Sequence, residues 1–182
     1  EALWRFSLAF YARPGVAKAL LALQDRAAPD RAAVTVNLIL FGLWLGASQG
    51  RQLAEGELAP VATAIAPLAG AAVVPLRRLR RQLTPATARE GRPPGAASDP
   101  ELQALRRRVA GLEIEAERRV QYRLAARAAG ASDAQPAQPQ GDRLAIAQAN
   151  LAIILGGEAG SPEAAVLRGA LGTLTRRTGP GT

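Results

Sequence analysis

The sequence contains neither cysteine nor histidine among its 182 residues. Without cysteine there can be no disulfide, thiol nucleophile or thiolate metal site. Without histidine the chain lacks the commonest general base and the commonest metal ligand. No glycine-rich phosphate loop of the G-x-x-x-x-G-K or G-x-G-x-x-G type occurs either. We therefore expect no metal, no cofactor and no catalytic residue set, and the sequence favours a non-enzymatic protein without deciding that point.

Aromatic residues are also scarce, at 4% of the chain, and Lys18 is the only lysine. Alanine, leucine and arginine dominate instead, and these residues favour helices. Strand-like alternation of β-branched residues is almost absent. The composition predicts an all-α fold, which we interpret as one domain over residues 1–182, a compact bundle of about six or seven helices.

The most apolar stretch is VTVNLILFGLWLG at residues 34–46. A helix that is hydrophobic on all sides is usually buried, so we expect residues 31–49 to form the central helix of the bundle. The stretch is shorter than the roughly 20 residues needed to cross a bilayer. No signal peptide is recognisable, and the expectation is a cytoplasmic protein without a membrane span.

Apolar residues at spacings of three and four predict further helices on both sides of this stretch. Pro67 and Gly70 are expected to end or kink one of them. Residues 84–97 are rich in proline and glycine and predict a mobile insert, and residues 130–141 form a second low-complexity break. The helix at 99–129 is long enough to serve in oligomer formation. The expected helices span residues 3–11, 14–27, 58–68, 73–83, 99–129, 142–155 and 161–175.

The strongest electrostatic feature lies in VVPLRRLRRQL at residues 73–83. Residues 76–95 contain six arginines and one glutamate, a net charge of +5 within a chain of net charge +8. Helical spacing would place the leucines of 73–83 on one face and the arginines on the rest. Such a cluster is suited to an anion or an acidic protein, or it is simply a solvated helix face. The candidate binding residues are Arg77, Arg78, Arg80 and Arg81.

No aromatic residue occurs between Trp44 and Tyr122. Because single-stranded nucleic acids are usually bound by stacking on aromatic side chains, this argues against nucleic acid as the partner. An acidic protein is the expected partner, with nucleic acid kept as an alternative.

Asn37, Phe41 and Trp44 share one face of the expected central helix, at steps of four and three. A buried amide beside a tryptophan could bind a ligand carbonyl or hydroxyl. The alternative is a structural asparagine that bonds to a neighbour, because buried polar groups need partners.

Glu113, Glu115 and Glu117 resemble a catalytic carboxylate set, but di-metal helical bundles pair such glutamates with histidine. The sequence therefore favours ion pairs on a helix surface for these residues, with Arg118 and Arg119 beside them.

Three blocks resemble a proteobacterial family of all-helical proteins that carries a domain-of-unknown-function label of the 2390 type. They are residues 3–26, 36–46 and 73–83, and residues 111–121 and 149–155 are also similar. The inserts at 84–97 and 131–141 depart from the family pattern. The resemblance implies a compact, cytoplasmic helical protein and implies no activity.

Three functional hypotheses follow from these observations. The first is an interaction or adaptor module that uses the arginine-rich helix. The second is a helical bundle that holds a small apolar ligand in its core near Trp44. The third is a carboxylate-dependent enzyme.

Overall fold

The structure of the protein is a computed structural model that describes residues 1–27, 35–83, 99–130 and 140–177. These residues contain helices and turns and no strand, which confirms the all-α prediction. The insert expected at 84–97 lies outside the described residues, as do residues 131–139 of the break expected at 130–141. Residue 130 instead ends α7, and residues 140 and 141 begin α8. The helices are α1 (Ala2–Tyr11), α2 (Val16–Arg26), α4 (Thr35–Gln49), α5 (Leu58–Leu68), α6 (Val74–Gln82), α7 (Pro100–Gly130), α8 (Gln140–Leu155) and α9 (Pro162–Arg177), with a π turn η1 (Ala69–Val73) before α6 and a 3₁₀ turn η3 (Gly156–Gly160) before α9.

Helix α4 is the central element of the bundle, as its composition predicts. Every residue from Val36 to Gly46 is buried. One side of the helix, including Phe41, packs into a core shared with α1, α5 and α7. The other side, including Ile39, packs into a second core shared with α2, α8 and α9. The expected start of this helix at 31–34 lies outside the described residues.

Two glycines let α4 approach α8 more closely than side chains would allow. Gly42 and Gly46 are four residues apart and therefore lie on one face of the helix. A Cβ at Gly46 would collide with the backbone of Ala147, and one at Gly42 would collide with the side chain of Ile154. Because a backbone cannot move aside as a side-chain end can, Gly46 is the more demanding position.

Asn150 joins the same helix pair to the loop that follows α4. Its side chain is completely buried. Its Oδ1 accepts a hydrogen bond from the Leu53 amide at 2.8 Å, and its Nδ2 lies 3.0 Å from the carbonyl oxygens of Gly42 and Arg51. One buried side-chain amide thus hydrogen-bonds to three backbone groups, in α4 and in the loop that follows it.

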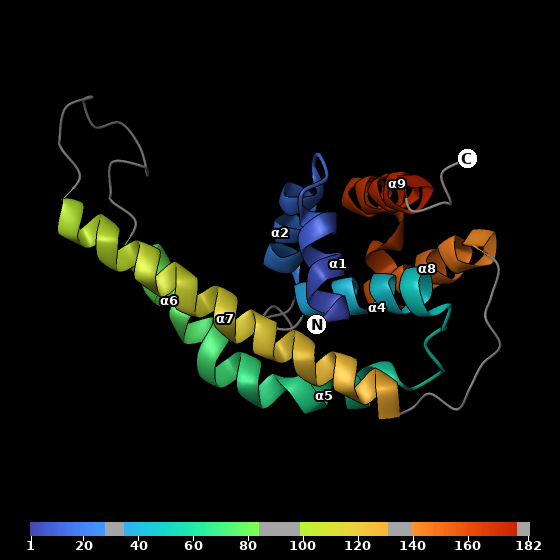
Figure 1. The fold of residues 1–182 in the computed structure, drawn as a ribbon, viewed down its shortest axis with the longest axis horizontal. Coiled ribbons are helices and arrows are strands. Elements are labelled where there is room, and N and C mark those ends of the chain that lie inside the picture. The colour runs from blue at the N-terminus through green and yellow to red at the C-terminus, as the bar shows by residue number, and fades with distance from the viewer. Residues whose placement is uncertain (28–34, 84–98, 131–139, 178–182) are drawn as a thin grey trace.

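Helices α5 and α6 form one continuous rod through η1, and α7 runs antiparallel beside it (Figure 1). Figure 1 also shows the N-terminal end of α7 reaching beyond the other helices, so that α6 and α7 form an arm of the molecule. The α-helix α5 ends at Leu68, directly after Pro67, as expected. The chain nevertheless continues in a helical path, because Gly70 lies in the wider turn η1, in which the Val74 amide bonds to the Ala69 carbonyl five residues earlier.

Within the described residues, the rod Leu58–Gln82 is long enough and apolar enough to cross a membrane by length and composition. Core helices of soluble proteins meet the same criteria. In this structure the rod packs along α7.

Candidate functional site: an arginine cleft

The π turn decides which way the arginines of α6 face. It adds about one residue to the helical turn, which rotates all following residues by about 100°. Arg77 and Arg80 face α7, and the side chain of Arg77 is 14% exposed. Val73 is buried and Leu76 packs against the core, but Leu79, expected on the same face, is 41% exposed. The expected division into an apolar face and an arginine remainder therefore holds only in part.

Arg77 and Arg80 form ion pairs with the glutamates of α7. Arg77 Nε lies 3.0 Å from Glu113 Oε1, and a terminal nitrogen of Arg77 lies 2.7 Å from Glu117 Oε1. Arg80 donates to the other oxygen of Glu113. Glu113 is buried, so these contacts are ion pairs between two helices and not the surface pairs that the sequence favoured.

The two glutamates respond to this environment in opposite ways. Burial raises the pKa of Glu113, but hydrogen bonds from Arg80 and Arg77 outweigh it and hold the pKa below its usual value. At Glu117 burial dominates and the pKa lies above its usual value, although Arg77 acts against this. The hydrogen bond to Glu113 also raises the pKa of Arg80. Glu113, which stays ionised and pairs with both Arg77 and Arg80, is thus the main partner of these two arginines.

The remaining two candidate arginines point away from these pairs. Arg81 lies 3.6 Å from Asp25 of α2, and both side chains are more than half exposed. Arg78 is exposed and has no ion pair among the residues that the structure describes. The structure thus divides the predicted cluster into two structural arginines and two that are accessible.

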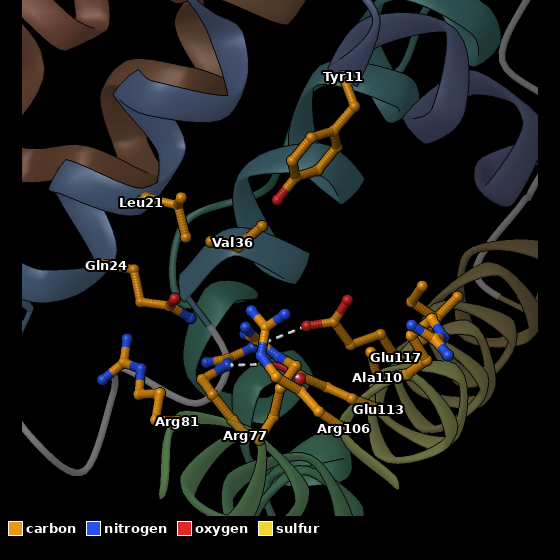
Figure 2. A pocket seen from close by; sticks show the side chains of 13 residues that line it. Tyr11, Leu21, Gln24, Val36, Arg77, Arg81, Arg106, Ala110, Glu113 and Glu117 are labelled. Carbon is orange, nitrogen blue, oxygen red and sulfur yellow. Dashed lines mark hydrogen bonds and ion pairs between the residues drawn. The ribbon is translucent and has the colours of Figure 1, made fainter. Parts of the chain in front are cut away.

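A cavity of about 370 Å³ opens between the α6–α7 arm and the helices α1, α2 and α4. We call it the arginine cleft. It is lined by Tyr11, Leu21, Gln24, Val36, Arg77, Arg80, Arg81, Arg106, Arg107, Ala110, Glu113, Ile114 and Glu117. Five arginines against two glutamates leave three excess positive charges along its walls. Figure 2 shows Leu21, Gln24 and Val36 on the wall opposite Arg77, Arg106 and Glu113.

Tyr11 extends from the end of α1 with its hydroxyl directed toward the centre of the cleft (Figure 2). Burial, reinforced by the nearby charge of Glu117, raises the pKa of Tyr11 to about 12. The hydroxyl therefore remains a hydrogen-bond donor at neutral pH. It has no hydrogen bond within the described residues, so a bound ligand could accept one from it.

Sequence reasoning missed Tyr11, Arg106 and Arg107 as cleft residues. Arg106 and Arg107 were recognisable only as part of the polar side of a long helix. Their role depends on which helix lies opposite, and no local pattern in α7 contains that information. Arg107 is exposed and has no ion pair among the described side chains.

Asn37 lies in a buried hydrogen-bond chain. Its Oδ1 accepts a hydrogen bond from Gln121 Nε2 at 3.2 Å, and the Gln121 Oε1 lies 2.9 Å from the Ser7 hydroxyl. This chain links α4, α7 and α1 across the core. The geometry supports the structural alternative for Asn37, because its acceptor oxygen is already paired.

Trp44 is 5% exposed and packs into the core shared with α5 and α7. Its ring centroid lies 6.1 Å from that of Phe41. Phe41 also borders a second cavity of about 340 Å³, together with Arg51, Ala54, Glu57, Pro60, Val61, Arg127 and Ala128. Neither of these two cavities is lined by Trp44 or Asn37. The three residues expected to share a ligand are thus not brought together at either cavity.

The third glutamate of the expected carboxylate set does not join the other two. Glu115 pairs with Arg119 at 2.8 Å on an exposed face of α7, while Glu113 and Glu117 face the cleft. Over the described residues, no cluster of three or more acidic side chains could hold a metal ion.

Comparison with known proteins adds a family to this description. No curated protein and no solved structure matches the chain. A family described as "Protein of unknown function (DUF2390)" matches residues 2–124. This stretch runs from α1 into α7 and includes every residue that lines the arginine cleft, whereas α8 and α9 lie outside it. Since the match spans more than half of the sequence, the chain belongs to this family.

Proposed function

We propose that the protein is a non-enzymatic interaction module that binds an acidic segment of a partner protein in the arginine cleft. The observation that carries this proposal is the cavity between the arm and the bundle, with five arginines against two glutamates. Clusters of arginine are a recurrent means of recognising acidic motifs, because the planar guanidinium pairs with a carboxylate through two hydrogen bonds.

The arginines of the cleft differ in whether they are already paired. Arg77 and Arg80 are occupied by Glu113 and Glu117 and shape the wall of the site. Arg81 and Arg107 are exposed, and within the described residues Arg81 forms an ion pair with the exposed carboxylate of Asp25 at 3.6 Å. An incoming carboxylate could pair with either of them without breaking the interhelical ion pairs.

The test uses charge reversal at the accessible arginines only. We expect Arg81→Glu combined with Arg107→Glu to weaken binding of a fluorescent octaglutamate peptide more than tenfold, because like charges then face each other in the cleft. Fluorescence polarisation at low ionic strength measures the affinity. Substitution of all four α6 arginines would be less informative, because it would also break the pairs to Glu113.

The matched control is Arg108→Glu combined with Arg123→Glu, also on exposed positions of α7 but outside the cleft. Each substitution changes the charge by two, so both double variants have net charge +4 instead of +8. The control should retain most of the affinity. Equal losses in both variants, or no binding to the wild type, would contradict the proposal.

A second candidate function is self-association through α7. Leu105 and Leu112 are 45% and 58% exposed, and neither lines the arginine cleft. Burial of such side chains between two copies would stabilise a dimer. Light scattering after gel filtration should show a dimer that Leu105→Glu with Leu112→Glu dissociates. A wild type that is monomeric across a wide concentration range would rule this out.

A further inference from the structure

The arginine cleft contains exposed aliphatic side chains as well as charges. Leu21 of α2 is 49% exposed, and Ile114 of α7 is 52% exposed. Both line the cleft, one on each wall, and Val36 and Ala110 add further apolar surface to the same cavity. Among the nine large hydrophobic side chains that are exposed in the described residues, these two line one of the two cavities described above.

We infer that the acidic segment bound here is amphipathic and inserts an aliphatic side chain between Leu21 and Ile114. This inference rests on the proposed function and specifies the chemistry of the partner. A purely acidic segment would leave both aliphatic side chains in contact with water. A segment with leucine, isoleucine or valine beside its carboxylates would bury them while the carboxylates meet Arg81 and Arg107.

The polar groups of the cleft limit where this side chain can enter. Glu113 and Glu117 repel carboxylates near the ion pairs, whereas Arg81 and Arg107 attract them. The Tyr11 hydroxyl, which points toward the centre of the cleft, can donate to a neutral backbone carbonyl. The bound segment would therefore place its carboxylates at the arginines and its aliphatic side chain between the two walls.

Selection of binders from a random twelve-residue peptide display library tests this inference on the full chain. We expect enriched peptides to combine aspartate or glutamate with an aliphatic residue at a constant spacing. A synthetic peptide with the enriched sequence should bind Leu21→Ser and Ile114→Ser roughly fivefold or more weakly than wild type. Leu112→Ser is the matched control, because Leu112 is 58% exposed on the same helix as Ile114 and outside the cleft.

A double-mutant cycle measures the interaction energy between the aliphatic residue of the peptide and the side chains of Leu21 and Ile114. Serine in place of the aliphatic residue of the peptide should reduce affinity for the wild type but not for the protein with both cleft substitutions. Circular dichroism will confirm that the variants are folded, which half-exposed positions should permit.

The outcomes separate the two proposals. Acidic binders without an aliphatic preference, or with equal affinity for wild type and the cleft variants, would overturn this inference and leave the proposed function standing. Binders without acidic enrichment, or no binders, would overturn both.

Discussion

Two pairs of helices are held together by different interactions: α4 and α8 by close backbone packing, and α6 and α7 by ion pairs between side chains. At the junction, Gly46 and Ala147 bring two backbones together, and the completely buried Asn150 satisfies the polar groups left inside. In the arm, the helices are joined across a partly open interface by Arg77, Arg80 and their two glutamates.

This difference has a consequence for where binding can occur. The junction has no room for another molecule, because even a Cβ added at Gly42 or Gly46 would collide with α8. The arm borders a cavity of about 370 Å³ and keeps charged groups within reach of solvent. The junction therefore serves stability alone, whereas the arm also borders the proposed binding site. We expect substitutions at the junction to lower the free energy of unfolding more than substitutions in the arm.

The largest effect should come from Gly46→Val at the junction. The added side chain would collide with the backbone of Ala147, which cannot move without displacing α8. We expect the free energy of unfolding to fall by about 3 kcal/mol, as for other overpacked cores. Urea denaturation followed by circular dichroism gives this value.

Gly111→Ala in α7 is the matched control for that change. A Cβ at Gly111 meets no neighbour, so alanine should stabilise the helix by about 0.5–1 kcal/mol through its better helix propensity. If Gly46→Val were as stable as wild type, the two helices would not be as close as the structure places them.

Asn150→Ala should cause the next largest fall in the free energy of unfolding. It leaves the Leu53 amide and the carbonyl groups of Gly42 and Arg51 without their buried partner. We expect a loss of about 2 kcal/mol, because unpaired buried groups cost more than the hydrogen bonds contribute. Asn150→Asp provides a sharper comparison, since it keeps the acceptor for Leu53 but removes both donors. An unchanged urea midpoint in both variants would contradict the role assigned to Asn150.

The sequence was sufficient to predict the junction's central helix but not its close contact. A stretch of thirteen mostly apolar residues identifies a buried helix in any surroundings. Gly42 was readable only as an interruption of that stretch, because its partner Ile154 lies more than 100 residues away. The spacing of apolar residues predicts which helices form. It does not predict which helix packs against a given glycine.

The arm shows a second limit of prediction from sequence. The arginines of residues 77–81 were identified as the main charged feature, but helical spacing alone could not show which of them would face α7. The π turn at Ala69–Val73 rotates them and brings Arg77 and Arg80 to Glu113. No residue pattern in this stretch specifies a π turn, so the cleft could not be assembled before the helices were placed.

The two glutamates of the arm should give pH dependences of opposite sign. The lowered pKa of Glu113 means that its contribution to stability is present above its unfolded value near 4.3 and is lost as the pH falls through the folded value. The raised pKa of Glu117 means that its contribution is present at low pH and is lost as the pH rises through the folded value.

The measurement compares wild type with Glu113→Gln and with Glu117→Gln in urea, from about pH 3 to about pH 7. The stability difference between wild type and Glu113→Gln should grow with pH, whereas that for Glu117→Gln should shrink. We expect changes on the order of 1 kcal/mol, since the carboxyls and their arginine partners border the open cleft, where solvent screens their charges. Parallel slopes would show that the two carboxyls share one environment.

The smallest change in the free energy of unfolding should come from Arg78→Gln. Comparison with Arg77→Gln separates the exposed arginine from the paired one next to it. Both substitutions remove one charge from adjacent positions of the same helix. Arg78 is exposed, so its loss should change the free energy of unfolding by less than about 0.5 kcal/mol. Arg77 lies between Glu113 and Glu117, so its loss leaves two carboxylates facing each other and should cost about 1–2 kcal/mol. Equal effects would contradict the placement of Arg77 between Glu113 and Glu117.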